Sequence, residues 1–426
     1  MNRTGLDHIR QGRLRGRRGD GVDAFLGIPY AAPPARFRPP EPPLPWDGVR
    51  DATRVGPAAP QPRSRLAEVI GDRVPEQIED CLSLNVWRPS EPSAEPRPVL
   101  VFLHGGGFST GSGGLDWYDG ARLARRGDLV VVTINYRLGV LGYLPLEQPN
   151  LGLLDQIQAL RWVEENIGDL GGDPRSVTVA GQSGGAISIA AMMSGRAAGG
   201  LFQRAVLQSA PLGMRPRTPG EAGVLTAEFL DVLGADPHTA PVSELLAAQG
   251  EMVRRHPGGI PPFHLVAQDG MVAGDLVATV GESAAGSVRI LMGSTNDEAA
   301  AYGAGPEVTA RLFHRPLRRF ADLLAAGPSP AWVYRFGWSA PGNPLGSCHG
   351  LELPFVFGNL AACKDAAMLA GADEAVLTAM VDVVQTGWIG FVRDGDPGWP
   401  VYGPAGPVVE LLDLLSEPGG AGLITR

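Results

Sequence analysis

Short runs of apolar and β-branched residues recur along the chain, and between them lie longer segments in which apolar residues repeat every three or four positions. Short apolar runs bounded by turn residues are typical of strands buried on both faces. In the segment 153–167, apolar residues at 153, 154, 157, 160, 163 and 167 form one face of a helix. We expect a second helix directly after Ser183 and a third over about 374–393. The predicted strands are 99–103, 129–134, 177–180, 205–208, 288–292 and 332–336.

This alternation of strand and helix predicts an α/β fold, with a large, mostly parallel, twisted sheet and helices on both faces. The segment 211–286 breaks the alternation, and we interpret it as a helical insertion that forms part of a cap. Large α/β enzymes reach this length with insertions, so we interpret residues 1–426 as a single domain. Ligands bind at the carboxyl ends of the strands in such sheets, and we therefore seek the chemistry there.

Composition narrows the classes of function. A net charge of −9 argues against a nucleic-acid-binding protein, which carries a basic face. A membrane span is not expected, because the chain has no run of about 18 apolar residues. The basic segment 1–21 lacks the apolar core of a secretory signal. The three cysteines, Cys81, Cys348 and Cys363, are too few for a disulfide framework and favour a reducing, cytoplasmic location.

The first candidate for chemistry is Ser183, in the sequence Gly-Gln-Ser-Gly-Gly at 181–185. This pattern follows a valine-rich strand and opens an apolar helix. A sharp turn from strand to helix needs small residues on both sides of the serine, and it lifts the hydroxyl above the sheet. A glycine-rich turn without chemistry fits the same letters, so the pattern alone does not decide. A second match, around Ser109, lies in a long glycine-rich loop, and we interpret that serine as a loop residue.

A run of three glycines, 105–107, follows the predicted strand 99–103. Glycine allows positive φ, so such a loop can turn bare N–H groups toward one point. Together with the N–H of the residue after the serine, Gly184, these groups are the donors that a tetrahedral oxyanion needs. A phosphate-binding loop is the alternative, but it requires a lysine after a glycine, and the only lysine, Lys364, does not follow one. We interpret His104 as a support of the loop through a hydrogen bond rather than as a base.

A serine in such a turn is activated by a histidine that an acid holds, in the chain order serine, acid, histidine. Two histidines follow the best acid candidates: His349 has small neighbours, whereas His314 lies in a basic segment. The pattern favours His349. Both Asp297 and Glu298 follow the predicted strand 288–292, and the residues alone leave these two acids open.

Several segments, in order over nearly the whole chain, carry a resemblance to a known family. They are FLGIPYAAPP (25–34), EDCLSLNVW (79–87), HGGGF (104–108), VVVTINYRLGVLGYL (130–144), NLGLLDQ (150–156), GGDPRSVTVAGQSGG (171–185), LFQRAVLQS (201–209), GSTNDE (293–298) and HGLELPFVFGN (349–359). In these segments the chain resembles the type-B carboxylesterase family, which includes the cholinesterases, and is especially similar to the bacterial para-nitrobenzyl esterases. The combination is highly specific, because the motifs are many and widely spread.

The resemblance implies a serine carboxylesterase with the α/β-hydrolase fold, and the short spacing from Glu298 to His349, compared with typical relatives, implies a reduced helical cap. The resemblance also implies a small-molecule ester substrate and a mechanism without metal or organic cofactor. An acyltransferase, or an amide or carbamate hydrolase with the same triad, is the alternative, and a non-catalytic binding protein is a weaker one. The implied site residues are Ser183 as nucleophile, Glu298 as acid, His349 as base, and Gly106, Gly107 and Gly184 as oxyanion donors.

Four departures from the family pattern affect these expectations. Gln182 stands where the family usually has glutamate, which removes a negative charge near the histidine, and we expect a shifted pH profile. Gly184 replaces a usual alanine but keeps the N–H donor. Cys81 lacks the partner cysteine of secreted relatives, so we expect a free buried thiol. Only 51 positions separate Glu298 from His349, fewer than in typical relatives, and we therefore expect a more open site.

Overall fold

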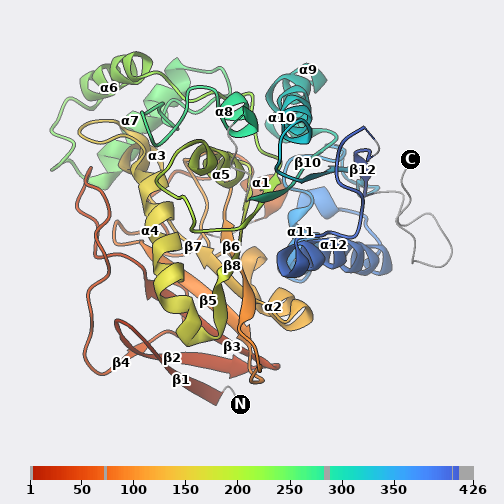
Figure 1. The fold of residues 1–426 in the computed structure, drawn as a ribbon. Coiled ribbons are helices and arrows are strands. Elements are labelled where there is room, and N and C mark those ends of the chain that lie inside the picture. Colours follow the sequence, from red (N-terminus) through yellow and green to blue (C-terminus); the bar gives the residue numbers. More distant parts are fainter. Residues whose placement is uncertain (1–2, 72–73, 283–287, 405, 412–426) are drawn as a thin grey trace.

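The computed structural model describes residues 3–71, 74–282, 288–404 and 406–411, and its strands form one 12-stranded sheet (Figure 1). The spatial order is β1-β2-β3-β5-β7-β6-β8-β9-β10-β11-β12, and β4 pairs with β2. The strands are β1 (Arg3–Ile9), β2 (Gly12–Gly19), β3 (Val22–Pro29), β4 (Val49–Asp51), β5 (Ser83–Pro89), β6 (Arg97–Leu103), β7 (Val130–Ile134), β8 (Gly172–Gln182), β9 (Arg204–Gln208), β10 (Arg289–Thr295), β11 (Ala331–Phe336) and β12 (Val409–Glu410).

Helices surround this sheet. The α-helices are α1 (Ala67–Ile70), α2 (Ala121–Gly127), α3 (Gly139–Tyr143), α4 (Leu151–Asn166), α5 (Gly184–Ser194), α6 (Pro219–Leu233), α7 (Val242–Arg255), α8 (Leu276–Glu282), α9 (Pro306–Thr309), α10 (Arg315–Ala325), α11 (Leu353–Phe357) and α12 (Glu374–Asp394). The 3₁₀ segments are η1 (Asp116–Tyr118), η2 (Ile167–Leu170), η3 (Glu298–Tyr302) and η5 (Ala367–Leu369), and η4 (Ala310–His314) is a π-helical turn. The three helices predicted from periodicity are confirmed as α4, α5 and α12.

The sheet is mixed rather than uniformly parallel. Neighbouring strands from β7 through β6 and on to β12 are parallel, whereas β1, β2, β3, β5 and β7 pair in antiparallel fashion. All six predicted strands are confirmed, because each coincides with one of β6 to β11. The antiparallel strands at the start of the chain were not predicted. Strand β2 shows why, since it buries only Leu14 and Gly16 and exposes arginines at 13, 15 and 17.

Apolar side chains pack against both faces of the sheet, as expected where helices cover parallel strands. Along β6, Val99, Val101 and Leu103 belong to one core, and Leu100 and Phe102 belong to the other. The first core includes buried residues of α4, α5 and α10, and the second includes those of α2, α11 and α12. Helices therefore cover both faces, as the alternation of elements predicts.

Helix α12 is the one described helix that is long and apolar enough to cross a membrane by length and composition alone. Its buried side chains face the sheet. Trp388 packs against Tyr334 of β11 with ring centroids 4.9 Å apart, and Phe391 packs against Trp332 at 5.6 Å. These are the contacts of a helix that covers a sheet. A core helix of this kind can also meet the length and composition criterion for a membrane span. The expectation of no membrane span stays a prediction.

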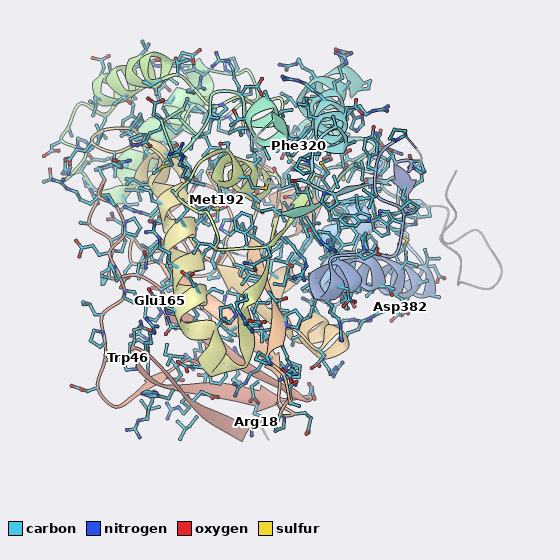
Figure 2. All side chains as sticks on the ribbon, in the orientation of Figure 1. Arg18, Trp46, Glu165, Met192, Phe320 and Asp382 are labelled. Atoms are coloured by element: carbon cyan, nitrogen blue, oxygen red, sulfur yellow. The ribbon has the colours of Figure 1, made fainter. Side chains whose placement is uncertain are left out.

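The predicted insertion, 211–286, contains α6, α7 and α8, joined by a long irregular stretch between α7 and α8. Helix α6 begins with a capping box, in which the Thr218 hydroxyl accepts from the Glu221 N–H and the Glu221 carboxylate accepts from the Thr218 N–H. Helix α8 packs against α5 and α10, which carry the buried side chains Met192 and Phe320 labelled in Figure 2. Residues 283–286 of the predicted insertion lie outside the described residues.

The carboxyl ends of the central strands lie side by side. Leu103 at the end of β6 pairs with Gly181 of β8, and Thr295 at the end of β10 pairs with Phe336 of β11. Strand β9 joins the two pairs, because it lies between β8 and β10. The loops after β6, β8, β10 and β11 therefore leave the same edge of the sheet, and these loops carry the predicted site residues.

A buried ion pair fixes the loop after β7 to helix α4. Two nitrogens of the Arg137 guanidinium lie 2.8 and 2.6 Å from the two carboxylate oxygens of Asp155, and the Arg137 N–H donates to the same carboxylate at 3.1 Å. A third guanidinium nitrogen donates to the carbonyl oxygen of Arg38 at 2.7 Å. The two side chains are only 5% and 0% exposed. One guanidinium therefore holds three separate segments together.

Replacing Asp155 by alanine should destabilise the fold by about 3–5 kcal/mol, because it leaves a buried guanidinium without a counter-charge. Denaturant unfolding of the variant and the wild type measures this difference. The control is Glu307→Ala, which removes the exposed partner of Arg315 and should change the free energy of unfolding far less. Equal effects of the two substitutions would contradict the assigned role of the buried pair.

Candidate active site

Ser183 stands at the turn between β8 and α5 with a φ of 53° and a ψ of −116°. Residues other than glycine rarely adopt a positive φ, and such strain costs about 1–3 kcal/mol where the surroundings impose it. The Ser183 N–H donates to the carbonyl oxygen of Gln208 at 2.9 Å, which ties the turn to β9. The residue is 5% exposed.

Glycines on both sides allow this turn to form. A Cβ on Gly181 would lie 2.6 Å from the carbonyl carbon of Gly185, and a Cβ on Gly185 would lie 2.1 Å from the carbonyl oxygen of Leu103. Helix α5 therefore begins in direct contact with the end of β6, where the glycine loop starts. This close packing gives the physical reason for the small residues around the serine.

The acid and the histidine of the predicted triad are in contact. Glu298 Oε2 lies 2.5 Å from Nδ1 of His349, and Glu298 Oε1 accepts the Thr295 N–H at 2.9 Å. Both side chains are buried, at 0% and 2% exposed. Asp297, the other acid that the residues left open, instead accepts the backbone N–H of Ser347 at 2.9 Å. Glu298 is thus the carboxylate that meets the imidazole, and a proton on Nδ1 leaves the lone pair of His349 on Nε2.

Ser183 is near this pair but does not bond to it. Among the described residues, no hydrogen bond joins the Ser183 hydroxyl to His349, and the Tyr302 phenol lies near that hydroxyl. Nε2 of His349 lies 3.1 Å from the side-chain nitrogen of Gln182, the residue that precedes the serine. The Tyr302 ring also contacts the imidazole, with centroids 5.5 Å apart. Serine and histidine therefore share two neighbours, Gln182 and Tyr302.

Aromatic rings cover the imidazole of His349. Phe313 lies 5.4 Å from it between ring centroids, and Tyr302 forms the outer wall with 46% of its surface exposed. Neither aromatic residue was predicted from the sequence, although Tyr302 lies one helical turn after Glu298 and therefore near the same site. The side chains of the predicted triad are themselves buried. The expectation of a more open site stays a prediction.

The glycine loop presents bare amide groups beside the serine. Gly106 and Gly107 have φ values of 114° and 59°, which turn the loop toward α5. A Cβ on Gly184 would lie 3.3 Å from the Phe108 nitrogen and 3.4 Å from the Gly107 nitrogen, so the loop and the start of α5 are close together. The N–H groups of Gly106, Gly107 and Gly184 have no acceptor in the part of the chain that the structure describes. The positive end of α5 adds to the attraction for an anion.

His104 supports this loop, as predicted. Its Nδ1 lies 2.7 Å from the carbonyl oxygen of Gly105, and its ring stacks on Tyr136 with centroids 4.3 Å apart. The Tyr136 hydroxyl donates to the His104 carbonyl oxygen at 2.7 Å. Burial lowers the pKa of His104 to about 4, so the ring is neutral at pH 7.

The histidine and cysteine side chains that were considered as alternatives lie in surroundings that suit a structural role. Nε2 of His314, the rival base, lies 2.9 Å from the carbonyl oxygen of Thr295, and burial lowers its pKa. Burial raises the pKa of the Cys348 thiol to about 11, which keeps it protonated at neutral pH. Cys81 is free and buried, as predicted. The described residues contain no group of three or more His, Cys, Asp or Glu side chains that could hold a metal ion.

A second buried carboxyl group lies behind the triad and was not predicted. Glu352 is 1% exposed, and its Oε1 lies 3.4 Å from the Ser209 hydroxyl and 3.5 Å from the Gln208 side-chain nitrogen. Its Oε2 has no partner among the residues that the structure describes. Burial, together with the negative charge of Glu298, raises the pKa of Glu352 to about 7. An acid three positions after the histidine, inside an apolar segment, was the available signal.

These features define a class of enzyme. A serine at a strand-to-helix turn, a buried carboxylate–imidazole pair and a glycine loop meet at the carboxyl edge of the sheet, as they do in the α/β-hydrolase fold. A model described as the carboxylesterase family matches residues 6–301, a stretch that includes Ser183 and Glu298 but ends before His349. The chain belongs to the carboxylesterase family, and it is a carboxylic ester hydrolase.

Individual relatives extend this similarity over nearly the full chain. A para-nitrobenzyl esterase of Bacillus subtilis (strain 168) is 38% identical over 453 residues, covering 92% of this chain and 91% of the relative. A probable N-octanoylanthranilate hydrolase of Rhodococcus erythropolis is 38% identical over 441 residues, covering 94% and 96%. The solved structure of a thermophilic PNB esterase aligns with a TM-score of 0.88 at 34% identity, covering 95% of each chain. Most of the segment after residue 301, where the family match ends, is therefore shared with whole esterases.

Two neighbouring glycines should respond differently to alanine. Gly185→Ala places a methyl group 2.1 Å from backbone of β6, so we expect a loss of about 2–3 kcal/mol of stability and of most activity. Gly184→Ala meets its nearest atom at 3.3 Å, and we expect it to fold with activity within about tenfold of the wild type. Thermal unfolding and ester hydrolysis measure both effects. A Gly185→Ala protein as stable as Gly184→Ala would contradict the packing argument.

Glu352 should make stability depend on pH. Its folded-state pKa of about 7 lies above the ordinary 4.5, so the native protein binds the proton more tightly, and stability falls as pH rises from about 4.5 to about 7. Glu352→Gln removes this dependence. Between pH 4 and pH 8 we expect the stability difference, variant minus wild type, to move in favour of the variant by about 3 kcal/mol. Urea unfolding at the two pH values measures it, and a difference that does not change with pH would contradict the prediction.

Proposed function

We propose that the protein is a serine carboxylesterase that works through an acyl-enzyme, with Ser183 as nucleophile, His349 as base and Glu298 as acid. The observation that carries this proposal is the buried contact of 2.5 Å between Glu298 and His349, beside a serine in a strained strand-to-helix turn. A carboxylate on Nδ1 leaves Nε2 of the imidazole unprotonated and able to accept a proton, which is the state that a general base needs.

In the first half of the reaction, His349 takes the hydroxyl proton as the Ser183 oxygen attacks the ester carbonyl carbon. The carbonyl oxygen becomes an oxyanion, and the N–H groups of Gly106, Gly107 and Gly184 stabilise it. The imidazolium, held by Glu298, then gives its proton to the leaving alcohol, and the carbon–oxygen bond of the ester breaks. In the second half, water loses a proton to His349 and attacks the acyl-enzyme, which releases the acid and restores the serine.

Before this reaction, the Ser183 hydroxyl must come within hydrogen-bond reach of Nε2 of His349, which the Gln182 side-chain nitrogen contacts at 3.1 Å. We expect a change of serine rotamer to achieve this. The position of Tyr302 supports this movement, since Tyr302 lies near the hydroxyl and contacts the imidazole.

We also propose that the chain acts as a single cytoplasmic domain on small-molecule esters, without a metal or cofactor.

The second candidate function uses the same triad on other reactions. The protein would then hydrolyse an amide or carbamate, or transfer the acyl group to an acceptor other than water. The relative named as a probable N-octanoylanthranilate hydrolase favours it, at 38% identity over 94% of this chain. N-octanoylanthranilate is therefore a test substrate beside p-nitrophenyl acetate and butyrate. Product analysis with added alcohol or amine would reveal acyl transfer.

Ser183→Ala should lower kcat/KM for p-nitrophenyl butyrate by at least about 10³-fold, because the nucleophile is lost while substrate binding remains. The matched control is Ser109→Ala, which removes the serine of the second Gly-x-Ser-x-Gly pattern and should keep near-wild-type activity. A phosphonate inhibitor should label the wild type on the peptide that contains Ser183. Equal hydrolysis by wild type and Ser183→Ala would defeat the proposal. A folded wild type that neither hydrolyses nor labels would favour a binding protein.

A further inference from the structure

The side chain of Gln182 occupies the position on His349 that the serine hydroxyl needs. Its amide nitrogen lies 3.1 Å from Nε2 of the imidazole, and both residues are buried, at 4% and 2% exposed. The pair joins two strand ends, because Gln182 closes β8 and His349 follows β11. The contact therefore lies within the reacting centre, although Gln182 itself has no part in the triad.

Close backbone contacts hold this side chain in place. A Cβ on Gly105 would lie 2.2 Å from the Gln182 side-chain oxygen, so that oxygen packs directly against the glycine loop. On the other side, a Cβ on Gly350 would lie 3.8 Å from the Gln182 amide nitrogen. The amide is therefore packed against the oxyanion loop on its oxygen side, with its nitrogen toward the imidazole.

The chemistry of this contact depends on the protonation of His349. Glu298 accepts from Nδ1, so the neutral imidazole presents a lone pair at Nε2, and the N–H of an amide can donate to it. The imidazolium instead carries a proton on Nε2 and needs an acceptor there. An amide nitrogen offers none, so this contact favours the neutral ring over the charged ring.

We propose that Gln182 is a positioning residue that keeps His349 in its neutral, proton-accepting form, and so extends ester hydrolysis toward acid pH. The proposal rests on the function proposed above, in which His349 is the base. In the free enzyme Gln182 occupies Nε2, and during catalysis Ser183 shares or takes over that lone pair. Gln182 acts through the histidine and contacts no substrate.

Among the described residues, the segments next to His349 that carry other titratable groups are η3, η4 and the start of α11; on η4, Phe313 covers the ring and His314 follows it. Segment η3 contributes Glu298, on Nδ1, and Tyr302, against the ring, and α11 is preceded by Glu352. The Glu352 carboxyl titrates near pH 7, inside the range to be measured. Each variant at position 182 is therefore compared both in the wild type and in Glu352→Gln, where this titration is absent.

The test is the pH profile of kcat/KM for p-nitrophenyl butyrate between pH 4.5 and pH 9. In Gln182→Glu, a carboxylate would stabilise the imidazolium, and we expect the acidic limb to move to higher pH by about one to three units. Gln182→Met has a similar shape without donor or charge, and its limb should move in the same direction by a smaller amount. The proposal would be overturned if the acidic limb of the pH profile lay at the same pH in the wild type, Gln182→Glu and Gln182→Met. It would also be overturned if the limb moved to lower pH in Gln182→Glu.

A measurement on the unmodified protein covers the case in which a variant does not fold. Nitrogen NMR of histidine-labelled wild type, assigned with His349→Ala, should show His349 at pH 7 protonated on Nδ1 and unprotonated on Nε2. A proton on Nε2 at that pH would overturn the proposal. Phosphonate labelling distinguishes a failure of the proposed mechanism from a failure of the proposal for Gln182. Unlabelled Ser183 counts against the mechanism. Labelled Ser183, together with an acidic limb of the pH profile that does not shift in the variants, counts against the role of Gln182 alone.

Discussion

At the turn between β8 and α5 the chain passes so close to the end of β6 that a methyl group on Gly185 would lie 2.1 Å from the Leu103 carbonyl oxygen. This contact places the serine, the start of a helix and the glycine loop within a few atoms of one another. The positive φ of Ser183 follows from it, because the strand must reverse into the helix without room for side chains. A looser turn would separate the hydroxyl from the N–H groups of the glycine loop.

The histidine and its acid reach this turn through the sheet rather than through local sequence. Gln182 and His349 are 167 positions apart, yet they touch because β8 and β11 end at the same edge with only β9 and β10 between them. Each strand is held in register by parallel pairing and by side chains packed on both faces. The site therefore depends on the two cores, and a change of register in β10 or β11 would move Glu298 or His349 away from the serine.

The parts of this fold that were predictable from the residues have strong local patterns. Strands β6 to β11 are continuous apolar runs, and the turn at Ser183 has glycine on both sides, so both were predicted. The antiparallel strands at the start were missed because their exposed faces carry arginine, which masks the alternation. Glu298 and Asp297 were indistinguishable as neighbouring acids after one strand, and only the resemblance favoured Glu298. Glu352 and Tyr302 were missed because their spacing from His349 and Glu298 is a weak signal, and their surroundings come from the fold: Tyr302 contacts the His349 ring, and Glu352 contacts Gln208 and Ser209.

Electrostatics explains why a neutral amide suits position 182 in this chain. Glu298 already places one carboxylate on His349, and Glu352 lies close behind it, with a pKa raised to about 7 by burial and by the charge of Glu298. That rise means that the buried region resists a second negative charge at neutral pH. A glutamate at 182 would add a third carboxyl group, and each negative charge beside the ring favours the imidazolium. The amide adds no charge, and its N–H matches the lone pair that the neutral ring presents. Gln182 and a partly protonated Glu352 therefore act in the same direction, since both limit negative charge around the imidazole that we propose as the base.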